Sequence, residues 1–239
     1  MNRDIKWGSM VFRMSINGLI SYIHHSPLFE RMFHTLSYCL RTELKDCQTV
    51  LDLGCGWSSP LQFCKNIDFS VGVEAYKPYL DKSMRSGIHS KYMNKSIESV
   101  SFPERSFDAV ILIEVLEHLP NKVGKRILAN AERWAKKKVI VTSPNGFIEQ
   151  KSYDRNPLQR HLSGWNALTM KELGFQSKGL QGLKILRQPD SHHGKLTDTI
   201  RFRPRLFWFA VSALSQLLTY YTPSLAFDLF SVKKLQKAK

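Results

Sequence analysis

The sequence predicts an α/β fold built on a doubly wound sheet, and three observations carry this prediction. Residues Val50–Leu53 form a short apolar run with one carboxylate, which is typical of a buried strand. A glycine-containing turn and the start of a helix at Pro60 follow it directly. Ser70–Glu74 and Phe107–Ile113 have the character of further strands, and the second is long enough to be buried on both faces. A strand followed by a glycine turn and a helix forms the nucleotide-binding corner of such a sheet.

The turn after the first strand suits the close approach of a ligand. Gly54 and Gly56 can adopt a positive φ, and neither has a Cβ that would keep a ligand away from the backbone. Ser58 or Ser59 can cap the helix that follows, and Pro60 suits its first turn because the missing N–H would be unpaired there.

The charge at this corner indicates the kind of ligand. A dinucleotide fingerprint, G-x-G-x-x-G, would need a glycine where Ser59 stands, and the Gly-Lys pair of a P-loop is missing. Asp52 lies under the predicted turn and would repel a pyrophosphate. A ligand with an ammonium and a sulfonium group and no phosphate would be attracted instead. S-adenosylmethionine is such a ligand.

A second acid stands at the spacing that an adenosine ligand requires. Glu74 ends the next predicted strand, and an acid about 20 residues past the glycine turn can accept hydrogen bonds from ribose hydroxyls. Two further stretches follow in order, Ser101–Asp108 and Glu114–Leu119. Over residues 45–146 the chain thus resembles the class I S-adenosylmethionine-dependent methyltransferases, and among them the type 11 group. Glu114–Leu119 is similar to the "vLEHl" stretch that is usual in this family.

This resemblance implies a Rossmann-like sheet of seven strands with an antiparallel last strand. It also implies an N-terminal helical extension over residues 1–45, a methyltransferase domain over 46–239, and an apolar helical insertion in that domain at about 185–222. The Asp-Ala pair with which the family contacts adenine is replaced here by Ser96 and Ile97. The residues expected to bind S-adenosylmethionine are Asp52, Gly54, Cys55, Gly56, Glu74, Ala75, Ser96, Ile97 and Glu114.

Helical spacing predicts further elements around this core. An apolar repeat over Leu28–Leu40 indicates one amphipathic helix after Ser26-Pro27, and a patch from Trp7 to Met14 has helical spacing too. Leu61–Asn66 is expected to be the first crossover helix. Ser163 is expected to cap a helix that ends before Gly174.

Two histidines are candidates for a general base. His118 follows the fourth strand, and His161 precedes a helix that lies beside the substrate edge in this architecture. Each could accept a proton from an acceptor hydroxyl or could have only a structural role. Glu117 is expected to be a solvated or helix-capping acid, and Asp108 to hold the start of its strand. No residue pattern indicates a metal site, so none is expected.

The chain is strongly basic, with a net charge of +15. Such an excess favours an anionic partner such as nucleic acid, an anionic membrane surface or a phosphorylated carrier, and a merely basic surface is the alternative. The four cysteines have no C-x-x-C spacing and indicate no disulfide framework. This cysteine pattern fits a reducing cytoplasm and the N-terminus has no signal-peptide pattern, so a cytoplasmic location is expected.

The uncharged segment 206–221 fits either a membrane contact or a contact with protein. Arginines precede it and lysines close the chain, which is typical of a helix lying in a membrane interface. A helix packed on the sheet or in a dimer interface is the alternative. The expected function is methyl transfer to a small-molecule, glycan or lipid-linked acceptor. The alternatives are an RNA or protein methyltransferase that uses the basic surface, and a non-catalytic cofactor-binding protein.

Overall fold

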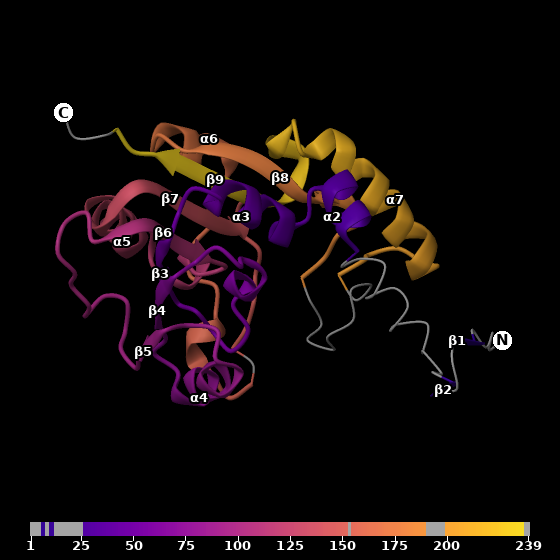
Figure 1. The fold of residues 1–239 in the computed structure, drawn as a ribbon. Coiled ribbons are helices and arrows are strands. Elements are labelled where there is room, and N and C mark those ends of the chain that lie inside the picture. The colour runs from indigo at the N-terminus through magenta and orange to yellow at the C-terminus, as the bar shows by residue number, and fades with distance from the viewer. Residues whose placement is uncertain (1–5, 8–9, 12–25, 153, 190–198, 237–239) are drawn as a thin grey trace.

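A seven-stranded sheet forms the centre of the computed structural model, which describes residues 6–7, 10–11, 26–152, 154–189 and 199–236 (Figure 1). The strand order is β5-β4-β3-β6-β7-β9-β8. The pairs from β5 to β7 are parallel, and β9 is antiparallel to both β7 and β8. This confirms the predicted doubly wound sheet with an antiparallel last strand. The strands are β3 Thr49–Leu53, β4 Phe69–Val73, β5 Lys91–Met93, β6 Phe107–Ile113, β7 Ala135–Pro144, β8 Gln176–Leu183 and β9 Ala226–Lys234.

The apolar runs of the central strands supply the cores on both faces of the sheet. In β3, Leu51 packs on one side and Val50 on the other, and Val110 and Ile111 alternate in the same way in β6. Helices α5 and α6 contribute to the first core and α3 to the second. The helices are α2 Pro27–Phe33, α3 Leu36–Leu44, α4 Lys77–Ser86, α5 Asn121–Trp134, α6 Ala167–Glu172 and α7 Arg205–Thr219.

Near the N-terminus the structure corrects two predictions. The helix expected over Leu28–Leu40 is divided into α2 and α3, because His34 takes a left-handed φ of 48° and Thr35 caps the second helix. In the patch from Trp7 to Met14, the short strands β1 Lys6–Trp7 and β2 Met10–Val11 replace the helical pattern. Met14 lies outside the described residues.

Two further predictions fail at helix starts. The expected crossover helix over Leu61–Asn66 is only a 3₁₀ turn, Pro60–Phe63, because Cys64 is already extended. Ser163 does not cap α6, and Asn166 does so instead. The hydroxyl of Ser163 donates to the carbonyl of Leu116 and accepts the indole N–H of Trp165.

Helix α7 forms the apolar insertion and packs against β8. Gly179 and Gly182 of β8 let the helix approach, since a Cβ at either one would come within 2.2 and 2.1 Å of the carbonyl oxygens of Thr219 and Ser212. Many apolar side chains of α7 remain exposed. Among the described residues, no helix combines the length and the apolar character needed to cross a membrane.

Candidate active site at the carboxyl edge of the sheet

The turn after β3 is built by two glycines in left-handed backbone conformations. Gly54 has a φ of 75° and Gly56 a φ of 58°. A Cβ on Gly54 would meet a methyl group of Val115 at 2.6 Å, so the turn packs directly on the segment that follows β6. A Cβ on Gly56 would meet no atom of the described residues within 4 Å. The outer side of the turn is therefore free for a ligand.

Asp52 supports this turn from beneath. Its side chain is almost fully buried and accepts a 2.6 Å hydrogen bond from the hydroxyl of Ser59, which also caps the 3₁₀ turn. Nε2 of His89 lies 3.4 Å from the same carboxylate oxygen. Burial raises the pKa of Asp52 to about 7 and lowers that of His89 to about 4, so each group is shifted toward its neutral form.

Glu74 follows β4 and ties the turn to the neighbouring strand. Its carboxylate accepts hydrogen bonds from the backbone N–H of Gly56 at 3.0 Å and of Tyr76 at 2.7 Å. Each carboxylate oxygen can accept a second hydrogen bond, so capacity remains for ribose hydroxyls. Burial raises the pKa of Glu74, while these backbone donors oppose the shift. Ala75, the next residue, is exposed.

The loop after β5 is tied to the loop after β4. The side-chain amide of Asn94 donates to the carbonyls of Glu74 and Ala75 at 2.9 and 3.0 Å. Ser96 is exposed, and its hydroxyl accepts the N–H of Glu98. Ile97 is buried, and its side chain packs in the core. The open glycine turn, the acid beside it and this loop fit an adenosine ligand without a phosphate.

Three acids gather where β6 ends and β9 begins. Glu114 takes a left-handed φ of 54°, and its N–H donates to the carbonyl and the hydroxyl of Thr142. Glu117 is 2% exposed, which corrects the prediction of a solvated acid. Burial and the charge of Glu114 raise the pKa of Glu117 well above the usual range. Burial likewise raises the pKa of Asp228, and the charge of Glu114 adds to this shift.

Two histidines lie against each other next to Glu117. The ring centroids of His118 and His161 are 4.9 Å apart. Backbone hydrogen bonds from Leu162 and Ser163 to the carbonyl of Glu117 hold the two chain segments together. Burial lowers the pKa of both histidines, that of His118 to about 4, so both are neutral at pH 7.

Part of the chain matches a known protein family. Residues 51–142 match a family model described as a methyltransferase domain. A protein of Pyrococcus horikoshii OT3 is 14% identical over 89% of this chain and 93% of its own, with a TM-score of 0.51. The plantazolicin methyltransferase BpumL, solved with S-adenosylhomocysteine, is 11% identical over 91% of this chain and 89% of its own, with a TM-score of 0.50. No curated protein sequence matches the chain.

A third structure is a complex that contains the Haloferax volcanii Trm112 methyltransferase activator. The matching chain is 14% identical over 92% of this chain and 96% of its own, with a TM-score of 0.52. Identities this low show the fold, and the family match adds the activity. Residues 51–142 form an S-adenosylmethionine-dependent methyltransferase domain.

The methyltransferase contains site residues that sequence reasoning missed. Val115 packs under Gly54, and His89 lies against Asp52. Asp228 comes from β9, far along the chain from the other two acids. Only Glu117 had a local signal, its place beside His118 in the run after β6. The contacts of the others depend on tertiary packing.

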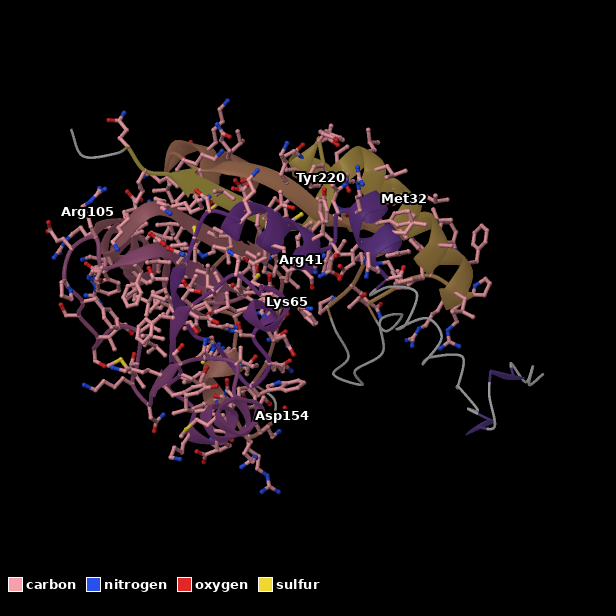
Figure 2. All side chains as sticks on the ribbon, viewed as in Figure 1. Met32, Arg41, Lys65, Arg105, Asp154 and Tyr220 are labelled. Atoms are coloured by element: carbon pink, nitrogen blue, oxygen red, sulfur yellow. The ribbon has the colours of Figure 1, made fainter. Side chains whose placement is uncertain are left out.

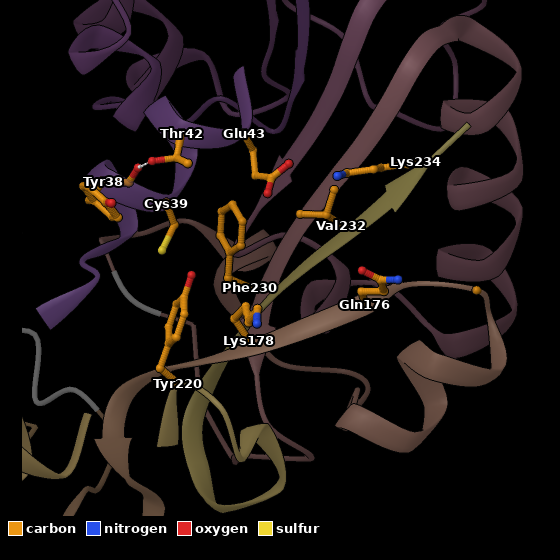
Figure 3. A pocket seen from close by; sticks show the side chains of 11 residues that line it. Tyr38, Cys39, Thr42, Glu43, Gln176, Lys178, Tyr220, Phe230, Val232 and Lys234 are labelled. Atoms are coloured by element: carbon orange, nitrogen blue, oxygen red, sulfur yellow. Dashed lines mark hydrogen bonds between the residues drawn. The ribbon is translucent and has the colours of Figure 1, made fainter. Parts of the chain in front are cut away.

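A separate cavity of about 190 Å³ lies between α3 and the β8–β9 pair (Figure 3). Residues of α3 such as Tyr38 and Cys39 line one side, and Lys178 and Phe230 line the other. The cavity also includes Gln176 and Lys234, at the amino end of β8 and the carboxyl end of the antiparallel β9. It therefore opens toward the amino edge of the sheet, away from the glycine turn of the methyltransferase.

Proposed function

We propose that this methyltransferase methylates a hydroxyl group of a small-molecule, glycan or lipid-linked acceptor. The observation that carries the proposal is the pair of neutral histidines, His118 and His161, beside the turn that follows β6. Val115, which packs on Gly54, stands three residues before His118. A hydroxyl must lose its proton to become a good nucleophile, and a neutral imidazole is suited to assist in this.

The remaining roles follow from the fit of the corner to the cofactor. When bound, S-adenosylmethionine supplies an electrophilic methyl group on a sulfonium. Glu74 is proposed to accept the ribose hydroxyls, and Gly54, Cys55 and Gly56 to let the ligand approach the backbone. Ser96 and the backbone of Ile97 are proposed to face the adenine. Glu114 is proposed to line the space between the methionine part and the acceptor. Holding the acceptor in line with the methyl group is mainly a proximity effect.

Helix α7 supports a lipid-linked acceptor. Its residue Ser212 packs on Gly182 near the carboxyl end of β8, so the turns before Ser212 extend beyond that end. Leu206 and Phe207 on these turns are 55% and 57% exposed. Met32 of α2 extends the apolar surface beside α7 (Figure 2). Such a surface, flanked by arginines, suits the interface of an anionic membrane.

Transfer of a tritiated methyl group from S-adenosylmethionine tests the proposal. The protein is incubated with extracts separated into lipid, small-molecule, RNA and protein fractions, and the label in each is counted. Label in the lipid or small-molecule fraction, lost in His118→Gln and His161→Gln and kept in His34→Gln, supports the proposal. Label in the RNA or protein fraction supports an alternative function and contradicts it.

A further inference from the structure

We infer that Glu117, His118 and His161 form a binding site for a divalent transition-metal ion. Each of the three residues offers one ligand atom, and these atoms lie within 4.8 Å of one another. Two imidazoles and a carboxylate are the ligand set of many catalytic zinc sites, in which a fourth position stays open. Ligands of a tetrahedral zinc ion, with bonds of about 2.0–2.1 Å, stand about 3.4 Å apart, so a small contraction would close the site.

The hydrogen bonds of the two histidines favour metal binding. Nδ1 of His161 lies 2.7 Å from the carbonyl oxygen of Ile148, and Nδ1 of His118 lies 3.2 Å from that of Arg160. A carbonyl oxygen can only accept, so each Nδ1 carries the proton and each Nε2 has a free lone pair. Metal-bound histidines usually make this same second hydrogen bond, which fixes the ring and its tautomer.

Glu117 supplies an independent observation. Its atom Oε2 is buried and has no hydrogen-bond partner among the residues that the structure describes. An unpaired buried oxygen of a carboxyl group costs free energy, and a bound cation would remove that cost. The two chain segments that carry the ligands are held together by the backbone hydrogen bonds to the carbonyl of Glu117.

The chemical role of this metal rests on the proposed function, whereas the binding itself does not. An ion at this place would bind the acceptor hydroxyl and lower its pKa. The hydroxyl proton would pass to solvent, and the acceptor oxygen would attack the methyl carbon as the carbon–sulfur bond breaks. The products would be the methylated acceptor, S-adenosylhomocysteine and one proton. The histidines would then serve as ligands instead of as bases.

The test is a titration of the full, EDTA-treated protein with Co²⁺, followed by visible absorption. We expect one Co²⁺ per chain at this site and displacement by Zn²⁺. In His118→Gln and His161→Gln the affinity should fall at least tenfold. Circular dichroism verifies that the variants are folded, and Zn²⁺ should raise the melting temperature of the wild type and not that of His118→Gln or His161→Gln.

The matched control is the double variant His192→Gln/His193→Gln, which removes another histidine pair of the sequence that lies outside the described residues. It should bind Co²⁺ at the inferred site like the wild type. Absence of binding in the wild type, or loss of binding only in this control, would overturn the inference. Methyl transfer to the lipid or small-molecule fraction that continues in EDTA, without metal binding, would refute the inferred metal site and leave the proposed acceptor class. Metal binding with label only in RNA or protein would refute the proposed acceptor class and leave the metal site.

Discussion

Asp52 combines nearly complete burial with a hydrogen bond from Ser59. Its place under the glycine turn gives it a structural part in the corner, in addition to the charge that it offers to a cationic ligand. Because burial raises its pKa from 3.8 to about 7, the ionised form destabilises the folded state. This carboxylate therefore costs stability at neutral pH in the absence of a ligand.

The substitution Asp52→Asn should raise stability at pH 8 and not at pH 4. As pH rises from about 4 to about 7, the unfolded chain loses this proton before the folded protein does, so stability falls across that window. Asparagine cannot ionise and avoids a loss of about 4 kcal/mol at most. Melting temperatures between pH 4 and 8 measure the difference, with the surface variant Asp81→Asn as control. If the melting temperatures of Asp52→Asn and the wild type changed with pH in parallel, this prediction would be wrong.

The two glycines of the turn should respond differently to alanine. Gly54→Ala combines a left-handed φ with a collision against Val115, so we expect a loss of about 3 kcal/mol in the free energy of unfolding. Gly56→Ala has only the backbone strain and should cost about 1 kcal/mol. Its Cβ would instead fill the space left for the ligand and weaken binding. Denaturant unfolding and titration with S-adenosylhomocysteine measure the two effects, and equal losses of stability would contradict this difference.

At the scale of elements, the contact between β8 and α7 fixes the insertion on the sheet. Gly179→Ala should lower the free energy of unfolding by about 2–3 kcal/mol, because its Cβ would approach the carbonyl oxygen of Thr219 to 2.2 Å. Gly87→Ala, at the end of α4, is the control, with a φ of 63° and no atom of the described part of the chain within 4 Å of the added Cβ. Urea unfolding compares the two variants. A smaller loss for Gly179→Ala than for Gly87→Ala would show that α7 does not pack as described.

The strands and the glycine corner could be predicted because their signals are local. The run Phe107–Ile113 is apolar enough to indicate a strand buried on both faces, and the acids and glycines of the corner stand at fixed spacing. The 3₁₀ turn at Pro60–Phe63 and the break at His34 could not be predicted, because tertiary contacts outweigh helical propensity there. The contact of His118 with His161 joins distant segments, and no periodicity of the sequence indicates it.

At the scale of the whole molecule, the net charge of +15 and the exposed apolar face of α7 both favour contact with an anionic membrane surface. A basic protein is drawn to an anionic surface over a distance of about a Debye length, and an apolar helix face adds short-range affinity. The contact of α2 with α7 widens this face. The arrangement would bring the carboxyl edge of the sheet to a lipid-linked acceptor.

The double variant Phe207→Glu/Leu214→Glu should bind less to anionic vesicles. We expect the wild type to sediment with phosphatidylglycerol vesicles more than with phosphatidylcholine vesicles, and less at high salt. Both side chains are exposed, so the variant should keep its melting temperature. Leu168→Glu, on α6 and also exposed, is the control. Equal sedimentation of the variant and the wild type would exclude α7 as the contact, and a wild-type dimer that the variant disrupts would favour a dimer interface.

The central claim is that the corner formed by β3 and β4 binds S-adenosylmethionine through Glu74. Calorimetric titration of S-adenosylmethionine and S-adenosylhomocysteine tests it most directly, with Glu74→Gln beside the exposed control Glu104→Gln. We expect micromolar binding to the wild type and the control, and binding at least tenfold weaker to Glu74→Gln. Absence of binding to the wild type, or equal binding to Glu74→Gln, would contradict it.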